Sequence, residues 1–408
     1  MTGLLAFVWL GGPLFGMASA SPSEPAAARA TSSAPATPAA ATVRSSPPIT
    51  AASAVLMSVG SRRVLWEKNG WVRRAPASTT KIMTALVVAE RAGLDETVTV
   101  SARAAATPGS TIWLTAGETL SVRDLLYGLL LTSGNDAAVA LAEHVAGSVD
   151  DFAILMNREA KAIGATDTQF RNPDGLDEPG HYTTARDLAL IAGRALQEPT
   201  VARVVATKLT TIAWPGREVD RALRNKNRLL WEYEGADGVK TGFTDDAGKC
   251  LVASATRNGL HLVAVVMDSE DIWGDSAALL DYGFTRFGAA TAARRGEAVR
   301  SVRVSGGDRE RLTLVAGDNL VVPVAPGDEG RLRTRVDGQG ELRAPVSAGV
   351  TYGQLVAVLD GEDVASVPLV AAQDVRAQTV FQSFWGKLFD LFRQMVRSIA
   401  GRTMGRAR

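Results

Sequence analysis

The 408-residue sequence has a single cysteine, three histidines and almost no net charge. One cysteine, Cys250, cannot build a disulfide framework or a Cys-x-x-Cys metal site. It lies in residues 249–268, which predict two buried strands around an Asn258-Gly259 turn, so we expect a packed, inert thiol. No His-Glu-x-x-His motif occurs, so we expect neither a metal nor another cofactor. A net charge of +1 gives no basis for expecting nucleic-acid binding.

The scarcity of histidine also limits the kinds of nucleophilic catalysis that the chain can perform. None of His144, His181 and His261 lies in a motif suited to a Ser-His-Asp triad, and no Gly-x-Ser-x-Gly elbow is present. A serine hydroxyl is a poor nucleophile until a base takes its proton. A catalytic serine in this chain would therefore need a base other than histidine.

Lysine and arginine are absent from the first sixteen residues, although the segment otherwise resembles an export signal. Residues 4–15 are apolar, and Ala18-Ser19-Ala20 suits a small-residue cleavage site. Gly11-Gly12-Pro13 interrupts a stretch that is already short for a transmembrane helix. We therefore predict an export signal at residues 1–20.

The next segment, residues 21–48, is almost entirely alanine, proline, serine and threonine, which fill 24 of its 28 positions. Such a composition cannot bury an apolar core, so we predict a disordered spacer. The remaining chain has an ordinary globular composition and is long enough for more than one domain.

Three short motifs follow one another along the chain: Ser78-Thr79-Thr80-Lys81, Ser133-Gly134-Asn135 and Lys240-Thr241-Gly242. Each alone is weak, because a Ser-x-x-Lys is expected about once by chance in a chain of this length. Together, with about fifty and then about a hundred residues between them, they are typical of serine-type penicillin-recognising enzymes.

The first motif supplies a nucleophile and a possible base. Lys81 follows Ser78 by three residues, so the two side chains share one face of a helix and can meet. A lysine acts as a base only when it is neutral, which requires its pKa to fall from about 10.4 toward roughly 7–8. Burial and a second cation both lower a lysine pKa, and Lys240 is the second cation that the sequence suggests.

The second and third motifs surround this pair with polar groups. Ser133 could relay a proton to a leaving amine, and Asn135 could hold both Lys81 and a substrate amide. Alternatively, Ser133-Gly134-Asn135 is only a polar helix cap or turn. Lys240-Thr241-Gly242 is typical of a strand that borders a cleft, where glycine lets a ligand approach the backbone.

Beyond its motifs, the chain resembles the low-molecular-weight penicillin-binding proteins, the D-alanyl-D-alanine carboxypeptidases of the penicillin-binding protein 5 class. The resemblance runs from about residue 52 to the C-terminus. The segments that carry it, apart from the motifs, are residues 53–69, 172–177, 181–187 and 225–230.

The resemblance implies a role for each motif residue. Ser78 would be the acylated nucleophile and Lys81 its base, with Ser133 and Asn135 as the second-motif groups. Lys240 and Thr241 would bind the terminal carboxylate of the substrate, and Gly242 would belong to the same substrate-binding segment. The backbone N–H groups of Ser78 and Phe243 would form the oxyanion hole.

The resemblance implies removal of the terminal D-alanine from peptidoglycan stem peptides through an acyl-enzyme, which beta-lactams would also form. A D,D-endopeptidase acting on cross-links and a catalytically weak penicillin-binding scaffold protein remain alternatives. A serine beta-lactamase is a weaker one, because no Glu-x-x-Leu-Asn run is present to activate a deacylating water.

One segment departs from the family pattern. In well-known members an arginine about thirty-five residues after the Lys-Thr-Gly motif assists carboxylate binding. Asp275 stands at that place in an acidic stretch, and no Lys or Arg occurs between Arg257 and Arg286. Carboxylate recognition would then depend on Lys240 and Thr241, or on an arginine from elsewhere.

We expect an α+β fold with two domains. Residues 49–290 would form the catalytic domain, for which the resemblance implies a helical cluster beside a mostly antiparallel sheet. From about residue 296 the sequence changes to short valine-rich runs separated by Gly and Asp, which predicts a small all-β sandwich at 296–372.

Residues 375–408 predict an amphipathic helix. Val380 to Arg408 carry a net charge of +5, and apolar side chains recur there in steps of three and four. This pattern favours a helix in a membrane interface over one packed on the β domain. We therefore predict that the enzyme works on the outer face of the cytoplasmic membrane. The residues of the apolar face are Phe381, Phe384, Trp385, Leu388, Phe392, Met395 and Ile399.

Overall fold

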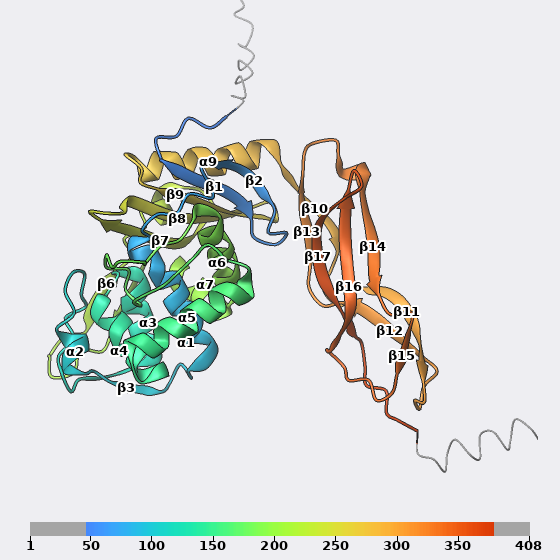
Figure 1. The fold of residues 1–408 in the computed structure, drawn as a ribbon, viewed down its shortest axis with the longest axis horizontal. Coiled ribbons are helices and arrows are strands. Elements are labelled where there is room, and N and C mark those ends of the chain that lie inside the picture. The colour runs from blue at the N-terminus through green and yellow to red at the C-terminus, as the bar shows by residue number, and fades with distance from the viewer. Residues whose placement is uncertain (1–45, 379–408) are drawn as a thin grey trace, which may run out of the picture. The chain divides into compact units, whose positions relative to one another are not determined.

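The computed structural model describes residues 46–378, and Figure 1 shows their arrangement. The predicted export signal at 1–20, the spacer up to residue 45 and the predicted C-terminal helix from residue 379 onward lie outside the described residues. Within the described part of the chain, no helix is both long and apolar enough to cross a membrane.

The centre of the catalytic domain is a five-stranded sheet in which every neighbouring pair is antiparallel. The strand that carries the Lys-Thr-Gly motif, Ala236–Thr244, is the last strand of this sheet. It is therefore an edge strand and pairs on one side only within the sheet. In spatial order the strands are β2 (Val64–Lys68), β1 (Ser53–Ser58), β9 (Leu260–Met267), β8 (Gly248–Arg257) and β7 (Ala236–Thr244).

The middle strands are buried on both faces, which explains their unbroken apolar sequences. In β9, Val263 and Val265 face one apolar core while Leu262 and Ala264 face the other, because successive strand residues point to opposite sides. As predicted, β8 and β9 form a hairpin around Asn258-Gly259, where both residues have the positive φ of a two-residue turn.

One face of the sheet is covered by a helical cluster and the other by a single long helix (Figure 1). Helices α6 and α7 contact strands directly, and α1 lies in the middle of the cluster. The cluster helices are α1 (Lys81–Arg91), α2 (Ala102–Ala105), α3 (Val122–Leu131), α4 (Asn135–Ala146), α5 (Val149–Ile163), α6 (Ala185–Gln197) and α7 (Pro199–Ala206). The opposite face carries α9 (Ile272–Arg286).

Shorter elements connect the helices and the strands of this domain. They are the 3-10 turn η1 (Ala77–Thr80), the helix α8 (Leu229–Glu232), and two hairpins, β3 (Thr97–Thr99) with β4 (Thr119–Ser121) and β5 (Leu209–Ile212) with β6 (Arg221–Arg224).

The C-terminal domain is all-β in the part that the structure describes, apart from the short turn η2 (Glu329–Arg331). A six-stranded and a two-stranded sheet share one apolar core. The larger sheet contains β14 (Leu332–Gly338), β16 (Thr351–Leu359), β17 (Glu362–Ala371), β12 (Arg311–Ala316), β11 (Ala298–Ser305) and β15 (Glu341–Arg343), in that order. The smaller pairs β10 (Gly288–Ala293) with β13 (Leu320–Val324). The predicted α+β class is confirmed.

The β domain extends further at both ends than our boundaries of 296 and 372. Ala293 and Val375 both lie in its apolar core, and Val375 exchanges backbone hydrogen bonds with Val346. Ala377 also pairs with Gly307. Residues 375–378 therefore complete this domain, although we assigned them to the predicted C-terminal helix.

Candidate active site

Ser78 lies in the 3-10 turn η1, one turn before α1 begins at Lys81. The predicted helix therefore exists, but its first turn is tighter than an α-helix. Ala77, just before Ser78, is buried and has a φ of 48°, a backbone conformation that costs a non-glycine residue roughly 1–2 kcal/mol. The turn packs against β7 and β8, and Ser78 itself is half-buried.

Lys81 is completely buried and directs its ammonium nitrogen at Ser78. The Lys81 Nζ lies 3.1 Å from Ser78 Oγ and 2.7 Å from Asn135 Oδ1, and it also donates to the carbonyl oxygen of Asp174. Burial lowers the pKa of Lys81 to about 7; Asp174 opposes the shift and Lys226 adds to it. A proton can therefore pass between Ser78 and Lys81 near neutral pH.

The cation that assists this shift differs from our prediction. Lys226, and not Lys240, adds to the lowering of the Lys81 pKa. Lys240 is itself buried and donates to the carbonyl oxygen of Thr241 at 2.9 Å. Burial, followed by the nearby Lys81 and Lys226, lowers the pKa of Lys240 well below its usual value. A group that loses its own charge in this way is a weak source of positive potential for Lys81.

Ser133 lies in the turn between α3 and α4, and Asn135 is the first residue of α4. Gly134 is the N-cap of α4 and makes no side-chain cap hydrogen bond, so this motif is not a polar cap. The Asn135 side chain binds Lys81 through Oδ1 and donates through Nδ2 to the carbonyl oxygen of Pro108 at 2.6 Å. Ser133 is 3% exposed, and its Oγ has no hydrogen-bond partner among the described residues.

An unpartnered buried hydroxyl is costly, at roughly 1–3 kcal/mol. The cost at Ser133 is accompanied by a left-handed backbone with a φ of 69°. Both features are typical of a functional position, where a ligand supplies the missing hydrogen bond.

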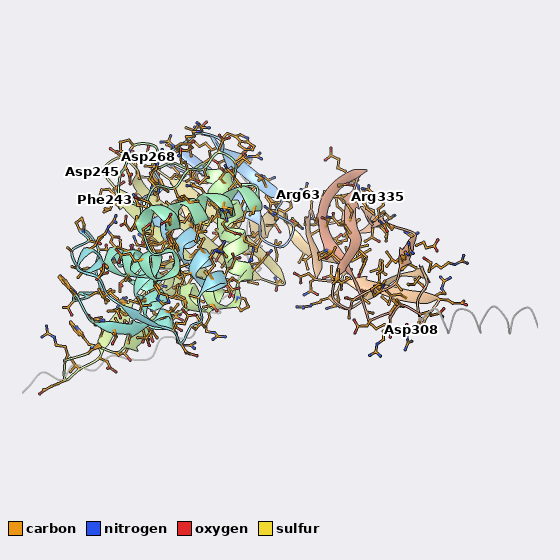
Figure 2. The ribbon with its side chains drawn as sticks, turned by 60° about the horizontal axis from the view of Figure 1, so that its bottom comes forward. Arg63, Phe243, Asp245, Asp268, Asp308 and Arg335 are labelled. Carbon is orange, nitrogen blue, oxygen red and sulfur yellow. The ribbon has the colours of Figure 1, made fainter. Side chains whose placement is uncertain are left out.

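Strand β7 brings the third motif beside the nucleophile. A Cβ added to Gly242 would lie 3.2 Å from the backbone nitrogen atoms of both Ser78 and Thr79. Glycine therefore permits a close approach of this strand to the nucleophile turn, whereas our prediction for this motif was the close approach of a ligand. The half-buried Thr241 precedes it, and the Phe243 side chain beyond it is 62% exposed at the domain surface (Figure 2).

A loop before α6, residues 172–184, closes the site behind Lys81. Thr84 of α1 donates to the carbonyl oxygen of Pro173 at 2.6 Å, next to the Asp174 carbonyl that binds Lys81. On the other side of the site, Thr244 of β7 donates to Asp177 at 2.7 Å. The sequence offered this loop only as part of a resemblance and did not indicate that a main-chain carbonyl would contact the base.

His181 anchors the same loop to the nucleophile turn. Its Nδ1 accepts from the backbone N–H of Arg171 at 3.3 Å, so the proton is on Nε2, which lies 2.9 Å from Thr80 Oγ1. Burial lowers the pKa of His181 to about 4, so the ring is neutral at physiological pH. His181 therefore acts as a structural support that ties Thr80, two residues after Ser78, to this loop.

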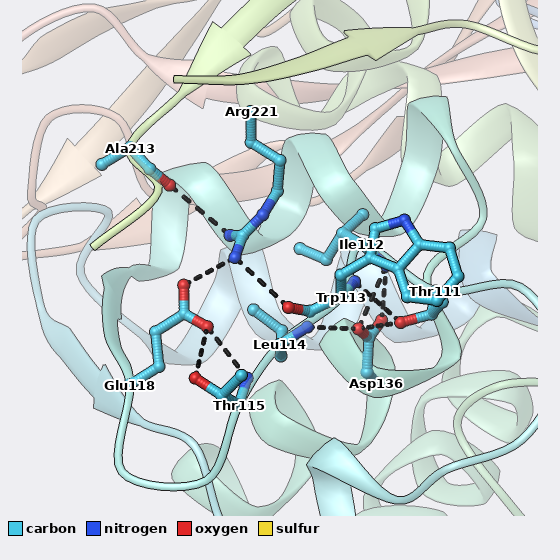
Figure 3. Close-up of polar contacts among 9 residues, drawn as sticks. All are labelled: Thr111, Ile112, Trp113, Leu114, Thr115, Glu118, Asp136, Ala213 and Arg221. Atoms are coloured by element: carbon cyan, nitrogen blue, oxygen red, sulfur yellow. Dashed lines mark hydrogen bonds and ion pairs between the residues drawn. The ribbon is translucent and has the colours of Figure 1, made fainter. Parts of the chain in front are cut away.

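A second loop, residues 108–115, reaches the site from the opposite side and is held by a buried carboxylate. Asp136 accepts from the backbone N–H groups of Ile112 and Leu114 at 3.0 and 3.1 Å, as Figure 3 shows. A buried ion pair between Arg221 and Glu118, 2.7 Å apart, supports the end of the loop. Neither carboxylate was among the residues that the sequence analysis selected.

Asp275, which takes the place of the arginine in the family pattern, is a structural residue. It is 2% exposed and lies in the first turn of α9. Its carboxylate accepts from the backbone N–H groups of Thr50 and Ala51 at 2.9 and 2.8 Å, and from Ser269 Oγ at 2.7 Å. Asp275 therefore fixes the segment before β1 to the end of β9.

The comparisons with known proteins agree with this geometry. Residues 40–271 match the D-alanyl-D-alanine carboxypeptidase family (peptidase S11), and residues 287–377 match the C-terminal domain of penicillin-binding protein 5. The chain belongs to the D-alanyl-D-alanine carboxypeptidase family. It is accordingly a serine-type peptidase of the penicillin-binding class.

Relatives within the family cover most of the chain. D-alanyl-D-alanine carboxypeptidase DacF of Bacillus subtilis (strain 168) is 34% identical over 333 residues, which make up 79% of this chain and 85% of the relative. D-alanyl-D-alanine carboxypeptidase DacA of Escherichia coli (strain K12) is 36% identical, over 84% of this chain and 86% of the relative.

Solved structures show the same relationship. Penicillin-binding protein 5 of Haemophilus influenzae has a TM-score of 0.65 and 33% identity, covering 82% of this chain and 99% of that one. A mutant of the Streptomyces K15 DD-transpeptidase has a TM-score of 0.56 and 36% identity. The match covers 59% of this chain and 100% of the transpeptidase chain.

Proposed function

We propose that the chain removes the terminal D-alanine from peptidoglycan stem peptides, with Ser78 as nucleophile and Lys81 as its base. The observation that carries this assignment is the fully buried Lys81, with a pKa lowered to about 7 and its Nζ 3.1 Å from Ser78 Oγ. A neutral amine at that distance can take the hydroxyl proton as Ser78 attacks the peptide carbonyl.

The remaining motif residues act on the charges that develop in this step. The tetrahedral oxyanion is held by the backbone N–H groups of Ser78 and Phe243, which the close approach at Gly242 makes neighbours. Ser133, whose buried hydroxyl has no protein partner in the described residues, passes a proton to the nitrogen of the departing D-alanine. Asn135 holds Lys81 and the substrate amide.

Water then attacks the acyl-enzyme, and the proton it gives up returns through Lys81. The products are the shortened stem peptide and the regenerated Ser78 hydroxyl. Beta-lactams acylate the same serine. Lys240 and Thr241 contribute to the binding of the substrate's terminal carboxylate, with Gly242 leaving room for the ligand backbone.

A D,D-endopeptidase, in which the leaving group is a cross-linked peptide, uses the same residues. A catalytically weak scaffold protein is less compatible with the site, because the buried Lys81 lies within hydrogen-bond distance of Ser78 and has a lowered pKa. Its main support in the sequence is the acidic stretch around Asp275, where the family's arginine is missing.

Mass spectrometry of the protein incubated with a stem pentapeptide tests the assignment. Loss of one alanine from the pentapeptide is expected. Cleavage of a cross-linked dimer without trimming of the pentapeptide would favour the endopeptidase, and an unchanged pentapeptide and dimer would contradict both activities.

We further propose that the protein works on the outer face of the cytoplasmic membrane after export. The support is in the sequence: a predicted signal at 1–20 and an amphipathic, basic segment that lies beyond residue 378, outside the described residues.

Truncation for this test belongs after Gln378, because Val375 is part of the β-domain core. The full mature chain is expected to float with anionic vesicles, and the truncated chain to stay at the bottom while keeping its activity. A full chain that also stays at the bottom would contradict the membrane interaction.

A further inference from the structure

Three lysines share the candidate site, but only one of them is exposed. Lys81 and Lys240 are both buried, whereas Lys226 is exposed. The field of Lys226 nevertheless reaches both, since it helps to lower the pKa of each. An anionic ligand that enters the site can therefore contact the Lys226 ammonium before the ligand has lost its contact with solvent.

The backbone of Lys226 is fixed to both the second and the third motif. Its N–H donates to the carbonyl oxygen of Leu131 at 3.0 Å, two residues before Ser133. The following residue, Asn227, donates through Nδ2 to the carbonyl oxygen of Gly238 at 2.8 Å, two residues before Lys240. These two hydrogen bonds hold the backbone around Lys226 between the second and the third motif.

The ammonium group of Lys226 has one hydrogen-bond partner among the described residues. Its Nζ donates to Ser110 Oγ at 3.1 Å, which leaves two of the three ammonium N–H groups for a ligand. Ser110 is itself fixed, because its carbonyl oxygen accepts from the backbone N–H of Asn135 at 2.7 Å. Within residues 46–378, no carboxylate lies within ion-pair distance of Lys226 Nζ.

We propose that Lys226 is a specificity-determining residue that binds the terminal carboxylate of the substrate, together with the hydroxyl of Thr241. This rests on the proposed carboxypeptidase function. The place of the family's arginine is unsuitable for this task, because Asp275 there is a buried carboxylate whose oxygens accept hydrogen bonds from Thr50, Ala51 and Ser269. In this proposal Lys226, from a different part of the site, supplies the positive charge that the missing arginine would provide.

Lys226 has a second effect on catalysis, because its charge also lowers the pKa of the base Lys81. Experiments can distinguish this effect from carboxylate binding. An effect on the base changes the pH profile for every acylating ligand, whereas carboxylate binding matters only for ligands that carry the carboxylate. Pairs of ligands that differ in this one group therefore isolate the proposed contact.

The test uses the full mature chain and the variants Lys226→Gln and Lys226→Arg, with Lys161→Gln, an exposed position on α5, as the matched control. The kcat/KM is measured for a peptide ending in D-Ala-D-Ala and for its C-terminal amide. Lys226→Gln is expected to lower kcat/KM for the carboxylate form about 10- to 100-fold, the usual scale for losing a hydrogen bond to a charged group. The amide should change little.

Lys226→Arg should keep most of the preference for the carboxylate, because it retains the charge and the donors. An unchanged ratio of carboxylate to amide in Lys226→Gln would overturn the proposal, as would an equal loss for both peptides. The Lys161→Gln control should behave as the wild type. Thermal denaturation of each variant excludes a folding defect as the cause of a loss.

A second measurement does not require peptide turnover. The rate of Ser78 acylation by benzylpenicillin is compared with that by its methyl ester, using intact-protein mass spectrometry. Lys226→Gln should abolish most of the preference for the free acid. A preserved preference would overturn the role of Lys226 even if Ser78 is acylated normally, whereas a wild type acylated by neither form would instead contradict the proposed function.

Discussion

Gly175 lies directly against Ala77, so that a Cβ on Gly175 would come 1.9 Å from the Ala77 carbonyl oxygen. The loop that gives Lys81 its third hydrogen-bond partner therefore touches the backbone just before the nucleophile. Gly175 also has a φ of 84°, which L-residues rarely adopt. The position of Asp174 relative to Lys81 depends on this contact.

Replacing Gly175 with alanine should consequently displace the loop from the nucleophile turn. We expect Gly175→Ala to lose several kcal/mol of stability, of order 3 kcal/mol, and to be acylated by penicillin at least about 10-fold more slowly. Gly180→Ala is the matched control: it has a similar φ of 83°, but its Cβ would meet only the flexible Arg171 side chain at 3.2 Å. It should lose about 1 kcal/mol and keep its acylation rate. Equal effects of the two variants would refute the contact.

The assignment of the nucleophile predicts that fluorescent penicillin labels Ser78. Ser78→Ala should abolish labelling and leave the protein folded, because the change removes one hydroxyl from a half-buried side chain. Gel fluorescence measures the label and circular dichroism the fold. Label that persists in Ser78→Ala would move the nucleophile elsewhere.

The buried Lys81 predicts the pH dependence of acylation. Its pKa is lowered to about 7, so the neutral, proton-accepting form grows as the pH rises through that value. The acylation rate should therefore rise from about pH 5 and level off above about pH 8. Stopped-flow measurement with a coloured cephalosporin gives the profile. A rate that rises only near pH 10 would mean that the base has an ordinary lysine pKa.

Removal of the base itself should slow acylation by at least about 10²-fold in Lys81→Ala, the usual scale for loss of a general base. Because the variant also leaves Asn135 Oδ1 without its donor, its folding must be checked by thermal denaturation. A folded Lys81→Ala protein acylated at a near-normal rate would show that another group takes the proton.

Asp275 should matter for stability and not for substrate recognition. Asp275→Ala leaves the N–H groups of Thr50 and Ala51 without their acceptor, so we expect a loss of roughly 2–4 kcal/mol. Asp271→Ala, which removes the N-cap of the same helix, should cost about 1 kcal/mol. Urea denaturation measures both. A large rise in KM for Asp275→Ala, with unchanged stability, would place this carboxylate at the site after all.

The sequence by itself determined the candidate chemistry. Ser78 and Lys81 are three residues apart, and local helical geometry is enough to bring their side chains together. The alternation and the unbroken apolar runs of β8 and β9 likewise predicted two buried strands around the Asn258-Gly259 turn, because strand geometry and turn chemistry are local properties.

Only the tertiary structure decided which distant groups complete the site. The Asp174 carbonyl and the ammonium of Lys226 come from two separate loops and the buried carboxylate of Asp136 from helix α4, and no local periodicity records that they converge. Electrostatics in particular cannot be assigned from residue type, since the charge of a lysine depends on its burial. Hence the sequence suggested Lys240 as the second cation, but folding buries Lys240 and leaves Lys226 exposed at the site.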